Sequence, residues 1–329
     1  MSSPNDFKSC LADRMRDFLA YHRALGKRFE SEGDGLRLLD RYLLGQPVTT
    51  LEAITPAMLE AFLTGRPRQA RGFNTLWSTL RRFFDWLVLH DVLAQSPLTI
   101  PARRCTPPLR PFIFDRDQAH RLLEAAAQLR EHYLAYQRGP TYQLALALMY
   151  GLGLRVGEVS RLCRQDVDLE RQVLVIRQTK FAKSRLVPFG PRMAARLDTY
   201  RELAEPRRRT LRPDDPFLSL ARDKTMPLRS HSISRVFCEL VPQLELMIPP
   251  GVATPRAHHL RHSFAVGTLL RWYRAGVNPT ERLLHLSTFM GHVDPSSTAV
   301  YLTITADLLQ EASDRFERYA APSLKEVSS

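Results

Sequence analysis

A proline-rich segment between residues 94 and 111 divides this chain of 329 residues into two parts. Its prolines are Pro97, Pro101, Pro107, Pro108 and Pro111. Proline lacks a backbone N–H and clashes with the preceding helical turn, so a continuous helix cannot pass through this segment and an extended strap is expected. We therefore predict an N-terminal domain over residues 1–93, a linker over 94–111, a C-terminal domain over 112–320 and a loose tail over 321–329.

Apolar residues before the linker recur at intervals of three and four, which predicts amphipathic helices. We expect these helices over residues 7–25 and 36–44, from Pro56 onward with Thr55 as its N-cap, and over 73–88. The last helix has the widest apolar stripe, and arginines flank it. The pattern predicts a small helical domain of about 90 residues.

The C-terminal part combines helices with short strands. Asp115 and Gln118 have the spacing of a capping box at the start of a helix. A later apolar helix over 141–150 is broken by glycines, so Arg155 is expected to begin the next helix. Residues 167–169, 172–179 and 184–189 are rich in branched residues, which predicts three strands of an antiparallel sheet. The predicted fold class is mainly α with a small antiparallel sheet, with a helical N-terminal domain and a mixed α+β C-terminal domain.

The net positive charge lies mainly after residue 100. Of 47 basic and 34 acidic residues, 13 and 11 lie in the first 100 positions, so the remaining 34 and 23 leave a balance of +11 after residue 100. A protein this basic usually meets a polyanion such as nucleic acid. The alternative is a cationic surface that serves only solubility.

No apolar run approaches the roughly 20 residues of a membrane span. The first residues, Met1 to Asp6, contain no basic segment followed by an apolar core, so a signal peptide is not expected. We expect no membrane partner and a cytoplasmic location. The four cysteines should then be reduced.

His258, Arg261, His292 and Tyr301 form the most informative group of polar residues. Guanidinium and imidazolium groups bind phosphate oxygens, and a phenol is a possible nucleophile, so together they suit chemistry on a phosphodiester. A tyrosine by itself is more often a packed aromatic. His258 and His262 share a helical face and could ligate zinc, but the chain has no HExxH glutamate and no CxxC pair to complete a site.

The sequence His-His-Leu-Arg-His at 258–262, then Gly291-His292, then Tyr301 nine residues later resembles the tyrosine recombinase (phage integrase) family. In that family this order forms the C-terminal half of the active site. The first half is a glycine-bearing turn leading into an arginine helix, and residues 150–162, with Arg155, match it. The resemblance covers nearly all of the chain. It implies an N-terminal core-binding domain and a catalytic domain of the tyrosine recombinase type.

The resemblance implies a site-specific DNA recombinase of integrase or transposase type, which cuts and rejoins double-stranded DNA through a 3′-phosphotyrosyl intermediate without metal, cofactor or ATP. Glu158 lies three residues after Arg155 and can hold its guanidinium. The family's roles, carried over to this chain, are Tyr301 as nucleophile, Arg155 and Arg261 as phosphate clamps, His258 as an aid to proton removal, Lys180 as general acid and His292 as a donor to phosphate.

Further basic residues are candidates for DNA contact, although each is also compatible with a solvated charge. They are Arg71, Arg81, Arg82, Arg103, Arg104, Lys183 and Arg185. In the family a C-terminal helix, here residues 305–319, docks on a neighbouring protomer and yields a homo-tetramer on DNA; docking on its own domain is the alternative.

The stretch between Arg261 and His292 is longer than in simple family members, which resembles recombinases of mobile elements. Two other functions remain open. One is a catalytically silent DNA-binding protein of the same fold. The other is a zinc-dependent nuclease, which a chelator would inactivate.

Overall fold

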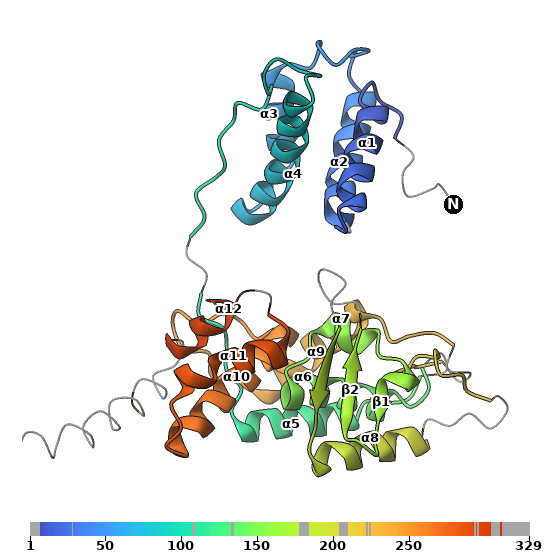
Figure 1. The fold of residues 1–329 in the computed structure, drawn as a ribbon, viewed down its shortest axis with the longest axis vertical. Coiled ribbons are helices and arrows are strands. Elements are labelled where there is room, and N and C mark those ends of the chain that lie inside the picture. The colour runs from blue at the N-terminus through green and yellow to red at the C-terminus, as the bar shows by residue number, and fades with distance from the viewer. Residues whose placement is uncertain are drawn as a thin grey trace, which may run out of the picture. The chain divides into compact units, whose positions relative to one another are not determined.

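The computed structural model describes residues 7–27, 29–106, 109–132, 135–177, 184–203, 210–221, 223, 225–292, 294, 296–303 and 310. The chain forms two compact units, Met1–Pro108 and Leu109–Ser329 (Figure 1). The division falls inside the predicted linker. Among the described residues, no helix combines the length and apolar character that crossing a membrane demands.

The N-terminal unit contains α1 (Ala12–Ala24), α2 (Glu30–Leu44), α3 (Pro56–Thr64) and α4 (Ala70–Leu89). The predicted apolar stripe of α4 is buried, and its aromatic residues pack with those of α1 in one core. Helix α2 begins six residues before its predicted start at residue 36. Its first turns include Gly33 and Gly35, which are buried. A Cβ on Gly35 would lie 3.1 Å from a Thr79 methyl, so glycine at this position allows α2 to approach α4 closely. These glycines do not give the apolar spacing from which a helix is predicted, and the sequence pattern therefore does not indicate the early start of α2.

Part of the predicted linker packs on the N-terminal unit. The Trp77 indole N–H of α4 donates to the Ile100 carbonyl at 2.7 Å, and Leu98 and Ile100 pack against the N-terminal core. Asn74 bonds to both the N–H and the carbonyl of Arg103 at 2.8 Å. Residues 98–103 therefore belong to this unit, because their side chains and backbone find partners on α4.

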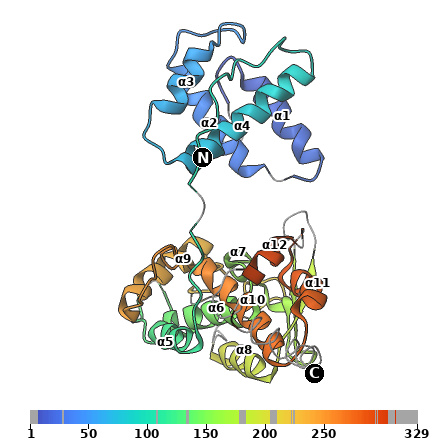
Figure 2. The ribbon, with the colours of Figure 1, turned by 90° about the vertical axis from the view of Figure 1, so that its left-hand side faces the viewer.

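The second unit is built around helix α6 (Arg138–Leu152), which is buried along most of its length. It packs against α5 (Arg116–Ala127), α8 (Pro191–Leu203) and α10 (Ala257–Arg274). Figures 1 and 2 both show α10 beside α6. The predicted capping box of Asp115 and Gln118 is present at the start of α5. The other helices among the described residues are α7 (Val156–Ser160), η1 (Arg164–Asp166), α9 (Ser230–Leu240), η3 (Val241–Leu244), α11 (Pro279–Met290), α12 (Ser296–Ala299) and η4 (Val300–Thr303).

Three short strands form an antiparallel sheet in the order β1 (Val167–Asp168), β2 (Val173–Ile176) and β3 (Arg185–Pro188). Val173 pairs with Pro188 and Ile176 pairs with Arg185, so Ile176 and Arg185 form the last pair before the connection between β2 and β3. The predicted fold class, mainly helical with a small antiparallel sheet, is confirmed.

Candidate active site

Arg155 is the N-cap residue of α7, directly after the turn that ends α6. Its Nη1 donates to Glu158 Oε1 at 2.8 Å, and its backbone N–H donates to Glu158 Oε2 at 2.9 Å. The predicted contact between Glu158 and the Arg155 guanidinium is therefore present. The Arg155 side chain is 34% exposed, so part of the guanidinium is accessible to a ligand.

Glu158 also binds Arg185, the first residue of β3. The two Nη groups of Arg185 donate to the two Glu158 carboxylate oxygens at 2.8 and 2.9 Å. The Arg185 side chain is only 9% exposed. The guanidinium of Arg185 is turned inward and paired with a buried carboxylate, and DNA contact by this residue stays a prediction.

Arg261 on α10 is the most deeply buried cation among the described residues, at 1% exposure. Its Nη1 donates to the Gly153 carbonyl at the end of α6, and its Nη2 donates to the Met290 carbonyl at 2.7 Å. Burial lowers the pKa of Arg261 to about 9, and the positive charge of Arg155 acts in the same direction. The side chain is still a cation at neutral pH, so it places a permanent positive charge inside the unit.

Three arginines together bind the C-terminal end of α11. Arg185 Nε donates to the Phe289 carbonyl at 2.8 Å, Arg261 to Met290 and Arg155 Nη2 to the Gly291 carbonyl at 2.8 Å. The last carbonyls of a helix lack helical partners and carry its partial negative charge, so cations are favoured there. This interaction holds the turn that leads directly into His292.

Two glycines make that arrangement possible. Gly153 ends α6 and Gly291 ends α11, with positive φ angles of 62° and 69°. A Cβ on Gly153 would lie 2.5 Å from the Phe264 ring of α10, and a Cβ on Gly291 would lie 2.7 Å from Arg185 Nη1. Glycine is therefore required at both positions by its backbone conformation and by the lack of space.

Tyr301, in η4, is buried, and its ring packs with Ala265, Val266 and Leu269 of α10 and with Leu286 and Met290 of α11. Its hydroxyl lies 2.6 Å from Nδ1 of His262. His258, predicted to assist removal of the tyrosine proton, lies beside that histidine, with the two imidazole centroids 4.6 Å apart.

Sequence reasoning considered His262 only as a zinc ligand and missed this contact. The useful signal was its four-residue spacing from His258 on the same helical face. That spacing correctly indicated two neighbouring imidazoles, but the partner of His262 is the tyrosine.

His292 follows α11 directly, and its Nδ1 lies 2.6 Å from the Thr298 hydroxyl of α12. Its ring stacks toward Tyr301 at a centroid distance of 6.4 Å and an interplanar angle of 22°. The structure therefore brings together five of the six predicted catalytic residues, namely Arg155, His258, Arg261, His292 and Tyr301. The sixth, Lys180, lies outside the described residues.

Burial and the neighbouring cations set the protonation states of these groups. Burial, followed by the charges of neighbouring histidines and arginines, lowers the pKa of His262 to about 3 and that of His292 to about 4, so both are neutral at pH 7. Burial alone would raise the pKa of Glu158, but the hydrogen bonds and charges of Arg185 and Arg155 lower it to about 2. Burial raises the pKa of Tyr301, and the charges of Arg261 and Arg155 oppose that effect.

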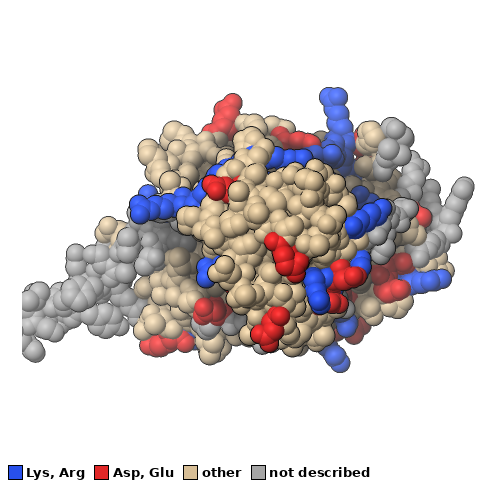
Figure 3. All heavy atoms as spheres, turned by 90° about the horizontal axis from the view of Figure 1, so that it is seen from above, with Lys and Arg blue, Asp and Glu red and all other residues tan. Residues whose placement is uncertain are grey.

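The predicted DNA-contact arginines of the N-terminal unit are exposed, and several have partners. Arg81 lies 3.5 Å from Asp85, and Arg82 lies 2.9 Å from Glu32. The guanidinium of Arg103 lies 4.0 Å from the centroid of the Phe73 ring. In the face shown in Figure 3, basic and acidic side chains of the described residues are interspersed. DNA contact by these arginines, together with Arg71 and Arg104, stays a prediction, and Lys183 lies outside the described residues.

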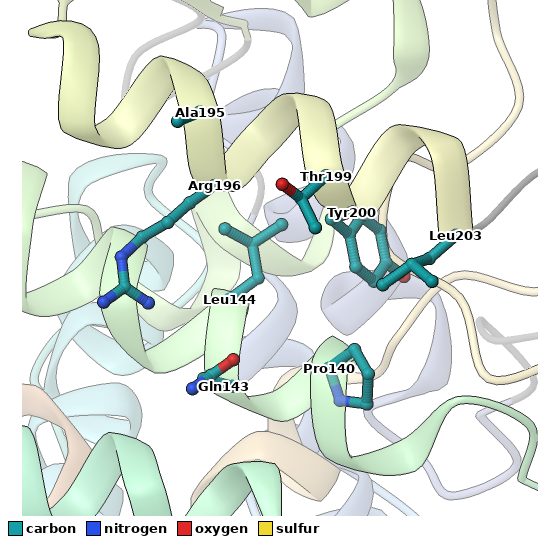
Figure 4. A pocket seen from close by; sticks show the side chains of 8 residues that line it. All are labelled: Pro140, Gln143, Leu144, Ala195, Arg196, Thr199, Tyr200 and Leu203. Carbon is teal, nitrogen blue, oxygen red and sulfur yellow. The ribbon is translucent and has the colours of Figure 1, made fainter.

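A pocket between α6 and α8 is separate from this cluster. Figure 4 shows Leu144 and Pro140 of α6 facing Thr199, Tyr200 and Leu203 of α8 across it. Its lining includes none of the predicted catalytic residues. The catalytic candidates lie instead where α7, α10, the end of α11 and η4 meet.

Comparisons with known proteins agree with this arrangement. The sequence model of the Phage integrase family matches residues 113–307. The chain is 30% identical over 318 residues to y4rB of Sinorhizobium fredii, named as a putative integrase/recombinase, with 94% of this chain and 98% of the relative covered. It is also 30% identical over 285 residues to the tyrosine recombinase XerC of Rhizobium meliloti, which covers 85% of this chain and 82% of the relative.

Solved structures share the fold. The Tn1549 transposon integrase in complex with transposon right end DNA has a TM-score of 0.63 at 18% identity, covering 93% of this chain and 99% of that chain. A lambda integrase tetramer bound to a Holliday junction has a TM-score of 0.62 at 18% identity, covering 90% and 78%. The family match spans more than half of the chain, in a range that contains Arg155, Arg261 and Tyr301. The chain therefore belongs to the phage integrase family and is a tyrosine recombinase.

Proposed function

We propose that this recombinase cuts and rejoins double-stranded DNA through a covalent 3′-phosphotyrosyl link on Tyr301. The observation that carries the proposal is the position of the Tyr301 hydroxyl in a cluster that also contains Arg155, Arg261 and three histidines. Fixed cations beside a phenol suit attack on a phosphodiester, because they stabilise the charge that develops on the phosphate oxygens.

In the cleavage step, Tyr301 Oη forms a bond to the scissile phosphorus while the bond from phosphorus to the 5′-oxygen breaks. The phenolic proton passes to His258, and the leaving 5′-oxygen takes a proton from Lys180. Arg155 and Arg261 bind the non-bridging oxygens, and such preorganised charge is usually the largest single contribution to catalysis. The phosphotyrosyl ester conserves the bond energy, so rejoining needs no ATP.

His292 completes the proposed phosphate site as a hydrogen-bond donor. Its position beside Tyr301 and after the arginine-bound end of α11 supports this role. The proposal includes no metal, since the guanidinium groups supply the positive charge that a metal ion supplies in other phosphoryl-transfer enzymes.

The zinc-nuclease alternative would use His258 and His262 as ligands. In the structure, His262 Nδ1 is instead in contact with the Tyr301 hydroxyl. Among the residues that the structure describes, no group of three or more His, Cys, Asp or Glu side chains is arranged to hold a metal ion. Activity in a chelator separates the two functions.

We further propose that the chain acts in the cytoplasm as a homo-tetramer on DNA, coupled by its C-terminal helix, and that it serves a mobile element. Support for the assembly comes from lambda integrase, which is known as a tetramer bound to a Holliday junction, and support for the setting comes from the Tn1549 transposon integrase. The predicted C-terminal helix at 305–319 lies almost entirely outside the described residues.

The test is capture of the covalent intermediate. The full chain is incubated in EDTA with a nicked duplex that carries its recombination site and releases a short 5′-hydroxyl fragment after cleavage. We expect a protein band shifted by the mass of the DNA, no shifted band from Tyr301→Phe, and an unchanged band from the control Tyr273→Phe on α10. A shifted band from Tyr301→Phe would exclude this tyrosine as the nucleophile, whereas DNA cleavage that forms no protein–DNA band and is lost in EDTA would favour the zinc nuclease.

A further inference from the structure

The hydroxyl of Tyr301 has a defined partner in the structure. Nδ1 of His262 lies 2.6 Å from Tyr301 Oη, which is a short hydrogen bond between groups 39 residues apart in the chain. Either the phenol donates to an unprotonated Nδ1, or Nδ1–H donates to the phenol oxygen. In both cases the oxygen that would attack phosphorus is held by a side chain on α10.

The site around His262 disfavours a proton on this imidazole. His258 and His259 lie close on the same helix, with ring centroids 4.6 and 5.7 Å from that of His262, and the buried cation Arg261 is the preceding residue. Burial and then these neighbours, with His292 from the end of α11, lower the pKa of His262 to about 3. A neutral imidazole can hold a hydroxyl by a hydrogen bond, but an imidazole with so low a pKa is a poor acceptor for the phenolic proton.

The same helix also holds the proposed phosphate clamp. Arg261 is bound to the carbonyls of Gly153 and Met290, which connect α10 to the ends of α6 and α11. The Tyr301 ring packs on α10 one and two turns further along. Two consecutive residues of this helix therefore act on the reacting groups: Arg261 as a phosphate clamp and His262 as the partner of the attacking hydroxyl. The relative position of phosphate and hydroxyl determines whether an in-line attack is possible.

We propose that His262 is a positioning residue, which holds the Tyr301 hydroxyl at a fixed place relative to Arg261 without taking its proton. This inference rests on the proposed role of Tyr301 as the nucleophile. In this role, the hydrogen bond with His262 aligns the attacking oxygen, and another group removes the proton.

Two substitutions separate the hydrogen bond from the ring. His262→Asn places an amide oxygen or nitrogen near the position of Nδ1, so it keeps a hydrogen-bonding partner but cannot accept a proton. His262→Phe keeps a ring of similar size and removes the hydrogen bond. The control is His285→Asn on the exposed face of α11.

The measurement is the single-turnover rate of covalent cleavage with the nicked duplex, beside DNA affinity and thermal unfolding of each full-length variant. We expect His262→Phe to be slower by about 10²-fold, the scale expected for a misplaced reacting atom. His262→Asn should stay within roughly threefold of wild type because the hydrogen bond is retained. DNA affinity should be unchanged in both. If His262→Phe unfolds below the assay temperature, His262→Leu replaces it.

Three outcomes would overturn the inference. Equal, large losses in the Asn and Phe variants would mean that His262 accepts the proton, and unchanged rates in both would mean that the contact has no role. Faster cleavage by His262→Phe would mean that the histidine restrains the tyrosine. A covalent link that depends on Tyr301 but not on His262 would refute only this inference, whereas no Tyr301-dependent link in the wild type would refute the proposed function itself.

Discussion

The interiors of the two compact units are built from different chemistry. The N-terminal unit has a core of leucine and phenylalanine side chains, and few of its described residues are buried polar groups. One of them is Asp40, which accepts hydrogen bonds from the backbone N–H groups of Lys8 and Ser9. The catalytic unit buries Glu158 and Arg261 together and brings Arg155 and Arg185 to the same place. The first core is stabilised mainly by removing apolar surface from water, whereas the second also depends on charges that must stay paired.

Removing a charge should therefore change the free energy of unfolding by different amounts at the surface and in the interior. A surface ion pair contributes little because water screens it, but a charge left alone in the interior is costly. Each unit contains a glutamate–arginine pair, and each contains a glycine with positive φ, so the comparison can be made with matched changes in one chain.

The largest effect is expected at Glu158. Glu158→Gln leaves Arg155 and Arg185 facing each other without a carboxylate, and we expect it to lower the free energy of unfolding of the catalytic unit by about 3–5 kcal/mol. The matched change Glu32→Gln removes the carboxylate that lies 2.9 Å from the Arg82 guanidinium. The Glu32 side chain is 16% exposed and the Arg82 side chain is 46% exposed. It should cost about 0.2–1 kcal/mol.

Equilibrium unfolding in urea measures both changes in the full chain. Tryptophan fluorescence can follow each unit separately, because the chain has 3 tryptophans. Replacing Trp77 and Trp86 by Phe leaves Trp272 as the reporter of the catalytic unit. Replacing Trp272 by Phe leaves the other two as reporters of the N-terminal unit. Equal losses from the two glutamine substitutions would mean that the buried network contributes no more than a surface pair.

A smaller effect is expected at the glycines. Gly26 has φ +77°, and no atom lies within 4 Å of the methyl group that alanine would add, so Gly26→Ala should cost only the backbone conformation, about 1–2 kcal/mol. At Gly291, with φ +69°, the added methyl would also meet Arg185 Nη1 at 2.7 Å. Gly291→Ala should cost a further 1–3 kcal/mol, roughly the penalty of overpacking, and should slow DNA cleavage because His292 is displaced. A Gly291→Ala variant no less stable than Gly26→Ala would show that Arg185 moves aside freely.

A further difference is expected in the response to acid. Burial lowers the pKa of His259 and His292 to about 4 and that of His262 to about 3, from an ordinary value of 6.5. Since the unfolded chain binds more protons below pH 6.5, the stability of the catalytic unit should fall as the pH is lowered from 6.5 toward 4. In the N-terminal unit, burial lowers the pKa of His22, so a smaller change of the same sign is expected there.

Urea midpoints at about pH 6.5 and 4.5, read with the same tryptophan variants, test this difference. Glu158 contributes little to this difference, because its pKa of about 2 keeps it ionised in the folded unit and the unfolded carboxyl, with an ordinary pKa of 4.5, titrates only at the lower end of the window. His262→Asn should reduce the acid sensitivity of the catalytic unit. A larger acid shift in the N-terminal unit would contradict the assignment of neutral, buried histidines to the site.

Most helices, the sheet and the type of chemistry are readable from the residues alone. Apolar periodicity located α1 and α4, capping residues located α3 and α5, and three short branched segments indicated the antiparallel sheet. The two motifs identified Arg155, Arg261 and Tyr301 as one site. These features are readable because they depend on residues close together in the chain, or on a pattern of residue types that one reaction requires.

The pairing of distant side chains is visible only in the folded chain. The early start of α2 depends on contact with Thr79 on another helix, and the inward position of Arg185 depends on Glu158 and on the end of α11. The contact between His262 and Tyr301 joins residues 39 positions apart. No local pattern encodes these pairings, since a buried arginine and a DNA-facing arginine have the same side chain and differ only in what the fold brings beside them.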